Sequence, residues 1–327
     1  MSNYVIGIDL GGTNMQIGVV DAANHIISRV QQKTHASQGA DAVIDRIIEG
    51  AANACTQAGL TLSDVSALGI AAPGAIDIPR GVVLEAPNLG WYDLPLQSIL
   101  TKRLAIPVAV DNDVNGAIWG EYMLGAGQGH DDLLGMWVGT GVGGGLVIGG
   151  RIYHGPMFTA GEVGQSIIDP FGAPGERTVE DNCSRTGLSR YIGRRLPQHP
   201  DSILHTLAER KSDQPGDIVI GSSKLAQAVT ANDRLACEAV ERAAFLLGVA
   251  AANWVTVLSL ARIIIGGGVT EALGDPFLQR IRESFEQHVF PQSAKRCEIV
   301  MTQLAHDSGL LGAALLAQEV VSERATK

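Results

Sequence analysis

Two turns in this sequence combine glycine with small polar side chains, a composition suited to binding phosphate. The first turn, Gly11-Gly12-Thr13-Asn14, directly follows a strand pattern that ends near Asp9. Glycine lets the backbone approach a phosphate and point its amides at the oxygens, while Thr13 and Asn14 add side-chain donors. Asp9 is a suitable acceptor for water molecules bound to Mg²⁺. Taken alone, this turn is explained more simply as a hairpin turn without a ligand.

The second turn, Gly139-Thr140-Gly141-Val142-Gly143-Gly144-Gly145, has five glycines in seven positions. So much glycine is costly in chain entropy, and a plain hairpin does not need it. Two such turns in one chain favour nucleotide binding. Neither turn has the Gly-Lys-Ser/Thr of a Walker A sequence, and neither follows the GxGxxG dinucleotide pattern. A third run, Gly266-Gly267-Gly268, follows an apolar strand, where bare backbone could receive an adenine or ribose or could simply begin a helix.

Carboxylates form the second set of candidate residues. Asp113 lies where a strand ends and a helix begins, and an acidic residue at that end of a strand points into the cleft of an α/β sheet. It could accept a hydroxyl proton near its normal pKa, because phosphoryl transfer is loose and proton removal can come late. The alternative is an aspartate that caps the helix. Glu162, Gln165 and Glu180 could bind sugar hydroxyls, although Glu162 and Glu180 alone would be ordinary surface residues.

The elements that must position these residues show a repeated design. Residues 4–20 and 133–148 both read as strand, Gly-Thr turn and strand, which suggests an internal duplication, although two unrelated glycine-rich hairpins would give the same pattern. Apolar periodicity predicts helices over 41–58, 115–124, 235–257 and 276–289, and an amphipathic helix from residue 308 to the C-terminus. The run of Arg185, Arg190, Arg194 and Arg195 is most simply a solvated helix face, to which we assign no role.

Composition limits the class of protein. The 327 residues are 46% hydrophobic and 18% charged, enough for a sizeable core and typical of two compact α/β domains rather than a disordered chain. A net charge of −10 argues against broad binding to nucleic acid or an anionic membrane, but allows a small anion such as a nucleotide. No signal peptide and no apolar stretch of membrane-spanning length are evident, so a reduced cytoplasmic location is the default.

Together the motifs resemble the ROK family of sugar kinases, within the hexokinase–actin–heat-shock-ATPase superfamily. The resemblance covers nearly the whole chain through IGIDLGGTN, GIAAPGAID, APNLGW, VDNDVNGAIWGE, VGTGVGGGLVIGG, AGEVG, IIIGGG and GLLGAALLA, and it is strongest to the bacterial glucokinases of that family. It implies a two-domain actin-like ATPase fold, of the hexokinase and ribonuclease-H-like type, with a duplicated α/β core and a cleft between the domains. We expect a smaller N-terminal domain of residues 1–117 plus 306–327 and a larger one of residues 118–305.

The resemblance also implies a role for each candidate residue. Asp113 would be the catalytic base that removes the proton of the hydroxymethyl group of a glucose-like hexose, and Asp9 would hold Mg²⁺ through water. Residues expected to bind the sugar are Gly74, Asn88, Asn112, Asp113, Glu162, Gln165 and Glu180. Residues expected to bind ATP are Gly11, Gly12, Thr13, Asn14, Gly139, Thr140, Gly141, Gly143, Gly266, Gly267 and Gly268. A homodimer is expected by the same resemblance.

One departure from the family pattern concerns zinc. The family commonly has a histidine after GExG and then a CxCGxxGC knuckle, whereas this chain has Gln165 and no cysteine between Gln165 and Glu180. Cys183 stands alone after Glu180, and zinc needs about four ligands, so we expect no structural zinc. We expect Gln165 to face the sugar site rather than solvent, and the placement of Glu180 is the part of the resemblance that the altered segment weakens most.

Several alternatives stay open at this stage. The acceptor could be N-acetylmannosamine, N-acetylglucosamine, mannose, fructose or allose, and the donor could be polyphosphate. A different class of function is a sugar-binding regulator without catalysis. Regulators of this family carry a DNA-binding winged helix before the first strand, and here that strand is expected to start at Tyr4, which leaves no room for one.

Overall fold

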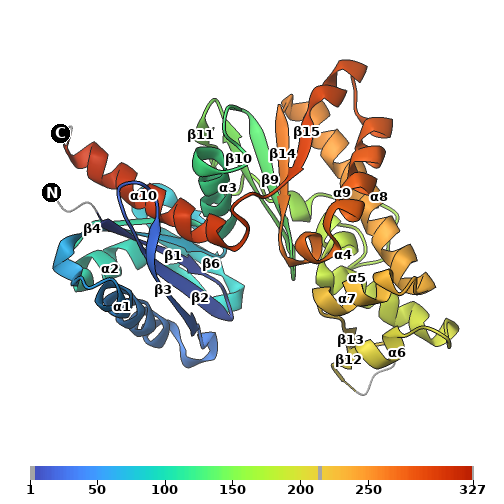
Figure 1. The fold of residues 1–327 in the computed structure, drawn as a ribbon, viewed down its shortest axis with the longest axis horizontal. Helices are drawn as coiled ribbons and strands as arrows, with labels where there is room; N and C mark the ends of the chain where they lie inside the picture. Colours follow the sequence, from blue (N-terminus) through green and yellow to red (C-terminus); the bar gives the residue numbers. More distant parts are fainter. Residues whose placement is uncertain (1–3, 213–215, 326–327) are drawn as a thin grey trace.

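The computed structural model describes residues 4–212 and 216–325 and contains two five-stranded mixed sheets (Figure 1). In the first sheet the strand order is β3-β2-β1-β4-β8. β1 is antiparallel to β2 and parallel to β4, β2 is antiparallel to β3, and β4 is parallel to β8. The bounds of these strands are β1 (Tyr4–Leu10), β2 (Asn14–Val20), β3 (Ile26–Lys33), β4 (Val65–Ala72) and β8 (Val108–Asn112).

The second sheet repeats this arrangement strand for strand. Its order is β11-β10-β9-β14-β15, in which β9, β10 and β11 form antiparallel neighbours and β14 and β15 continue in parallel. The bounds are β9 (Leu133–Val138), β10 (Val142–Ile148), β11 (Arg151–Ile152), β14 (Arg262–Gly266) and β15 (Glu298–Met301). The duplicated α/β core predicted from the two hairpins is therefore confirmed, because pairing order and direction agree across five strands.

Two smaller sheets and ten α-helices complete the described part of the chain. The small sheets are formed by β5 (Ala75–Asp77), β6 (Val82–Ala86) and β7 (Trp91–Leu94), and by β12 (Glu209–Arg210) and β13 (Ile218–Val219). The helices are α1 (Ala40–Gln57), α2 (Leu96–Leu104), α3 (Asp113–Leu124), α4 (Val179–Cys183), α5 (Arg185–Arg195), α6 (Leu204–Leu207), α7 (Ser222–Thr230), α8 (Arg234–Leu258), α9 (Gly268–His288) and α10 (Ser308–Ala325).

Helix positions follow from the spacing of apolar residues. In α1 the buried residues Ile44, Ile47, Ala51 and Ala54 recur at intervals of three or four, so one stripe of the helix packs on the first sheet. The part of the chain built around each five-stranded sheet is called a lobe below. In the second lobe α8 buries twelve of its residues, and it packs along α9 beside the second sheet (Figure 1). None of the described helices is long and apolar enough to cross a lipid bilayer.

The C-terminal helix packs against the N-terminal strand. α10, red in Figure 1, lies against the blue strands β1 and β4 of the first sheet. Glycines permit this close approach, because a Cβ on Gly69 would lie 1.8 Å from the carbonyl oxygen of Ala313, and one on Gly7 would lie 2.2 Å from that of Leu310. Helix and sheet backbones therefore touch directly, and the start of α10 is carried to the carboxyl end of β1.

The helix α3 lies between the two sheets (Figure 1). It packs on α10 through small residues, since a Cβ on Gly312 would meet the carbonyl oxygen of Gly116 at 1.7 Å, and it also packs on β10. The predicted domain division between residues 117 and 118 falls inside this continuous helix. The division itself stays a prediction.

Candidate active site

The candidate base, Asp113, is the first residue of α3 and directly follows β8. The side chain that caps α3 belongs to its neighbour, because Asn112 Oδ1 accepts hydrogen bonds from the amides of Val114 (2.9 Å) and Asn115 (3.2 Å). Asp113 Oδ1 also accepts from the Val114 amide at 2.9 Å. Since Asn112 supplies the cap, the carboxylate of Asp113 is left available at the mouth of the turn, and a helix cap does not account for it.

Four carboxylates, those of Asp9, Asp113, Glu162 and Glu180, lie close enough for one negative charge to raise the pKa of the next. Burial, with a smaller contribution from the negative charge of Glu162, raises the pKa of Asp113 to about 6. Burial and then the charge of Asp113 raise the pKa of Asp9 to about 7. Burial and then the charge of Glu180 raise the pKa of Glu162. The expectation of a near-normal pKa for Asp113 is wrong. Burial removes its carboxylate from water, and the negative charge of Glu162 lies nearby, so both effects raise the pKa.

Asp9, at the end of β1, faces a cavity of about 250 Å³ between the lobes, which Asp113 also lines. In the described chain the carboxylate of Asp9 has no hydrogen-bond donor and no cationic partner. A half-buried carboxylate in this state fits a hydrated divalent cation, which would supply the missing positive charge. Sequence reasoning missed other residues that line this cavity, namely Gln16, Trp137, Glu271, His306, Ser308 and Gly309.

The first predicted glycine turn is held by hydrogen bonds at one side and exposed at the other. The turn before β2 is secured by the buried Thr34, whose hydroxyl donates to the carbonyl oxygen of Gly11 at 2.6 Å and whose amide donates to that of Thr13 at 2.9 Å. Thr13 and Asn14 remain exposed. Sequence reasoning missed Thr34 because it lies twenty-three residues from Gly11 and carries no motif.

The second turn is shorter than predicted. β10 begins at Val142, and Gly143, Gly144 and Gly145 pair with β9 inside the sheet. Their bare backbone is explained by packing, because a Cβ on Gly143 would lie 2.6 Å from Cγ2 of Val114 in α3. Only residues 139–141 therefore form an open turn at this end of the sheet.

The third glycine run supplies the step from β14 into α9. Gly267 has a φ of 91°, and a Cβ there would lie 2.6 Å from the carbonyl oxygen of Val138. Only glycine fits such a position without strain. Gly267 and Gly268 line the same cavity as Asp9, whereas Gly266 is the last residue of β14 and lies against the Trp137 side chain.

On the other side of Asp113, the amide of Asn112 links two predicted sugar residues. Its Nδ2 donates to the carbonyl oxygen of Gly74 at 3.0 Å, and Gly74 has a φ of 102°. The side chain of Asn112 also donates to the carboxylate of Asp113 and thereby favours its ionised form. Asn88, predicted for the sugar as well, lies beside the first glycine turn, where a Cβ on Gly12 would be 3.2 Å from its own Cβ.

The remaining predicted sugar residues gather at the edge of the second sheet. Gln165 Nε2 lies 3.4 Å from Glu180 Oε1, and Glu180 Oε2 accepts from the Val142 amide at 2.9 Å. A Cβ on Gly141 would lie 2.3 Å from Glu180 Oε2, so the glycine makes room for this carboxylate. Gln165 is exposed, contrary to the expectation that it faces the sugar site rather than solvent.

Backbone hydrogen bonds organise the segment that leads to Glu180. The Val179 amide donates to the carbonyl oxygen of Ser166 at 3.0 Å, and Ile167 forms an antiparallel bridge with Thr178. The side chain of Thr178 then caps α4, accepting from the Asp181 amide at 3.0 Å. These contacts fold the segment back on itself and bring Glu180 next to Gln165. The altered segment can therefore position Glu180 without a zinc knuckle.

Cys183 has the chemistry of a core residue. It is fully buried, its thiol lies 3.6 Å from the carbonyl oxygen of Ala243, and burial raises its pKa to about 12. A thiol that stays protonated is a poor zinc ligand. Within the described residues no three or more histidine, cysteine, aspartate or glutamate side chains are arranged to hold a metal ion.

A contact between Asp111 and His154, behind the turn that carries Asp113, was not predicted from the sequence. Asp111, 3% exposed, accepts at Oδ1 from the Asn112 amide (2.7 Å) and from Asn115 Nδ2 (2.9 Å). Its other oxygen lies 2.7 Å from Nε2 of His154, which follows β11 in the second lobe. The pair therefore ties the turn that carries Asp113 to the opposite lobe. No sequence motif joins residues forty-three positions apart, so only the fold reveals it.

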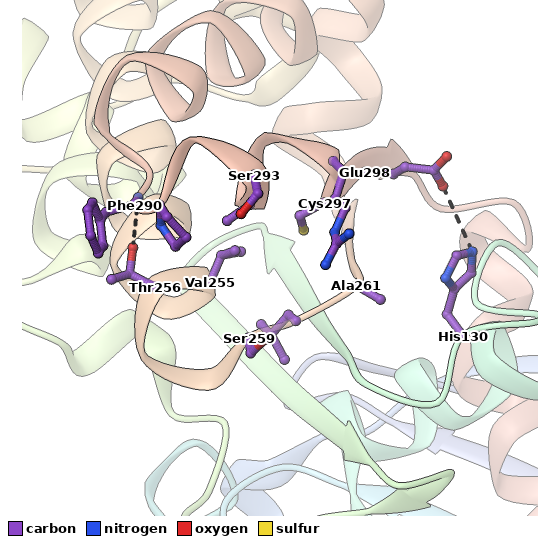
Figure 2. Close-up of a pocket in the computed structure, with 13 residues that line it drawn as sticks. His130, Val255, Thr256, Ser259, Ala261, Phe290, Ser293, Cys297 and Glu298 are labelled. Carbon is purple, nitrogen blue, oxygen red and sulfur yellow. Dashed lines mark hydrogen bonds and ion pairs between the residues drawn. The ribbon is translucent and has the colours of Figure 1, made fainter.

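A second hollow, of about 410 Å³, lies away from these residues (Figure 2). It is formed by the end of α8, including Val255 and Thr256, and by the segment from Phe290 to Glu298. Its only carboxylate, Glu298, is paired with Arg262 and His130. Because this hollow contains none of the predicted residues and no free acid or base pair, the candidate active site is the cleft around Asp113.

Comparisons with known proteins agree with this geometry. A profile of the ROK family matches residues 5–320. A protein of Halalkalibacterium halodurans named glucokinase is 32% identical over 97% of this chain and 95% of its own length. A ROK family glucokinase from Streptomyces griseus, solved with glucose and AMPPNP, has a TM-score of 0.80 and 32% identity over 97% of this chain and 99% of its own. A ROK hexokinase from Thermus thermophilus has a TM-score of 0.80 and 30% identity over 98% and 99%.

Proposed function

Because this chain belongs to the ROK family, we propose that it is an ATP-dependent sugar kinase that converts glucose to glucose 6-phosphate. Its actin-like ATPase fold and its similarity over nearly full length to a glucokinase solved with glucose and a nucleotide analogue support this activity. The observation that carries the proposal is the position of Asp113. It stands between Asp9, on the side suited to a metal-bound nucleotide, and Glu162 and Glu180, on the side suited to a polyol.

In the proposed reaction the hydroxymethyl oxygen of the sugar attacks the terminal phosphorus of ATP. A new oxygen–phosphorus bond forms, the bond to the leaving ADP breaks, and the proton of the hydroxyl passes to Asp113. The raised pKa of Asp113, about 6, makes it a stronger base than an ordinary aspartate while it remains mostly ionised at pH 7. Mg²⁺, bound to the nucleotide and reached by Asp9 through water, would offset the negative charge that the carboxylates and phosphates share.

Each predicted site residue except Gly143, which packs on α3, then has a proposed task. Asn112, Gly74 and Asn88 would bind the sugar from the first lobe, and Glu162, Gln165 and Glu180 from the second. The turns at residues 11–14 and 139–141 would hold phosphates, and the run at residues 266–268 would receive the nucleoside. Closure of the lobes, divided near residues 117 and 306, would exclude water that could otherwise take the phosphoryl group.

The proposal extends to the setting of the enzyme. We propose that it acts on free sugar and nucleotide in the cytoplasm, at the entry to glycolysis, and that it works as a homodimer without zinc. Light scattering of the purified protein would measure its mass, and a mass of one chain would contradict the dimer.

The proposal is tested by following ADP release from Mg²⁺–ATP over a panel of sugars. The panel contains glucose, mannose, fructose, allose, N-acetylglucosamine and N-acetylmannosamine, and a second series replaces ATP with polyphosphate. We expect the highest kcat/KM with glucose and ATP. A higher kcat/KM for another acceptor or for polyphosphate would replace the substrate assignment, and turnover with none of them despite sugar binding would point to a regulator.

A further inference from the structure

Arg185 differs from the other arginines of its helix in what its side chain contacts. Farther along α5 the ion pairs are Arg190 with Asp181 and Arg194 with Glu176, while Arg195 stacks on the ring of Tyr191. These three fit the solvated helix face expected from the sequence. Arg185, at the start of α5, turns toward the second glycine turn instead, and its Nη2 donates to the hydroxyl of Thr140 at 2.6 Å.

Three further contacts join this end of α5 to the same turn. The backbone amide of Arg185 donates to the carbonyl oxygen of Gly139 at 2.8 Å. The amide and hydroxyl of Thr186 donate to the carbonyl oxygen of Thr140 at 3.4 and 2.8 Å. The turn is therefore secured by backbone groups and by Thr186 without the guanidinium. The side chain of Arg185 is not needed to shape the turn, and it uses only one of five donors on Thr140.

The charge of Arg185 is uncompensated. It forms no ion pair with any described carboxylate, and it is only half-buried. The cavity beside Asp9 and Asp113 is lined by Glu271 as well, and its lining includes no lysine and no arginine. A nucleotide triphosphate brings several negative charges into this acidic cleft. Arg185 is a cation that the fold places beside one of the predicted phosphate turns.

The position of the turn indicates which phosphate the guanidinium would meet. Residues 139–141 adjoin the acceptor end of the cleft, because Glu180 Oε2 accepts from the amide of Val142 and occupies the space above Gly141. The other predicted nucleotide residue, Gly267, follows β14, which lies on the opposite side of β9 from β10. A nucleotide that spans from Gly267 toward Glu180 therefore presents its terminal phosphate to Thr140 and Arg185.

We propose that Arg185 binds the terminal phosphate of the nucleotide together with Thr140 and holds the phosphoryl group during its transfer. This inference rests on the proposed kinase function. The step keeps the balance described above, since the bond to the sugar oxygen forms, the bond to ADP breaks and the proton goes to Asp113, while Arg185 remains a guanidinium throughout. A guanidinium can contact two phosphate oxygens at once and thereby stabilise the charge spread over them.

The test compares AMPPNP with ADP, which lacks the terminal group. We expect Arg185→Ala to weaken AMPPNP binding by about 10–100-fold in calorimetry and to change ADP binding by less than about threefold, as one charge-assisted contact to a single phosphate requires. Its kcat for glucose should fall by at least about tenfold, and Arg185→Lys should recover part of the loss by restoring charge without the planar fork. Arg194→Ala, about two and a half turns farther along α5, is the matched control and should bind both nucleotides normally.

Equal weakening of AMPPNP and ADP would overturn the inference, because it would mean that Arg185 only holds the turn. Unchanged AMPPNP binding and turnover in Arg185→Ala would overturn it as well. Thermal melting of each variant separates these results from unfolding, and the lysine variant keeps the comparison available where the alanine variant melts early. Failure of the kinase proposal would be recognised in the unmodified protein, which would then phosphorylate no sugar. The inference about Arg185 would fail with it.

Discussion

The raised pKa of Asp113 predicts an acidic limb in the pH–rate profile at an unusual position for an aspartate. With a pKa of about 6 instead of the ordinary 3.8, about nine-tenths of the molecules carry the ionised base at pH 7 and about one-tenth at pH 5. The rate should therefore fall about tenfold or more between pH 7 and pH 5. An aspartate with an ordinary pKa would stay more than about nine-tenths ionised over this range, and its rate would hardly change.

Glu162→Gln tests the cause of this shift. The substitution removes a negative charge that raises the pKa of Asp113, so the acidic limb should move to lower pH, even though loss of a sugar contact lowers the rate at every pH. Part of the limb should remain, because burial is the larger cause. The titration of Asp9 is coupled to that of Asp113, and this variant isolates the neighbour on the sugar side.

The assay measures the initial rate of ADP release from pH 4.5 to 8.5 with both substrates well below KM, so that the profile reports the free enzyme. Glu283→Gln, which removes a surface carboxylate paired with Arg280 on α9, is the matched control and should leave the limb in place. A limb near pH 4 in the unmodified enzyme, or a limb that moves to higher pH in Glu162→Gln, would refute the reasoning.

Three further predictions follow from contacts around the cleft. Gly141→Ala should lower kcat/KM for the sugar by at least about tenfold, since its Cβ would lie 2.3 Å from Glu180 Oε2 and displace that carboxylate; near-normal kinetics would contradict the close approach. Asp9→Asn should abolish activity yet raise the melting temperature by a few degrees at pH 8. The pKa of Asp9 is raised to about 7, so the unmodified protein loses stability as this buried carboxyl ionises with rising pH. At pH 5 the carboxyl is mostly protonated, and the advantage of Asp9→Asn in melting temperature should be smaller. His154→Ala should leave Oδ2 of the buried Asp111 without its partner, which should lower stability by about 1–3 kcal/mol in denaturant titration and should also lower kcat. An unchanged denaturation midpoint would contradict this.

Local patterns in the sequence were sufficient for the elements and for the repeated core. The two Gly-Thr hairpins, the strand before Gly266 and the helix after Asn112 all form in the predicted regions, although α3 begins at Asp113 instead of residue 115 and α9 at Gly268 instead of residue 276. Hydrophobic spacing and turn residues act within a few positions, so one sequence carries that information. The same local evidence overestimated the second glycine turn, because Gly143 is required by the approach of α3 to β10 and not by a turn.

Contacts between distant residues could not be predicted in the same way. The pair of Asp111 with His154, the support of the first turn by Thr34 and the contact of Arg185 with Thr140 depend on how the sheets and helices pack. The pKa of Asp113 belongs to this group too, because its burial and its nearness to Glu162 arise from the folded chain and not from the local sequence of the turn.

The most direct test of the account is a comparison of the unmodified enzyme with Asp113→Asn on the same day, with glucose and Mg²⁺–ATP, by ³¹P NMR of the products and calorimetry of glucose binding. The account predicts glucose 6-phosphate and ADP from the unmodified enzyme. It predicts a rate about 10²–10⁴-fold lower in Asp113→Asn, the usual contribution of a general base, with glucose binding nearly unchanged. Near-normal turnover in the variant, or a phosphate on a different atom of the sugar, would contradict the central claim.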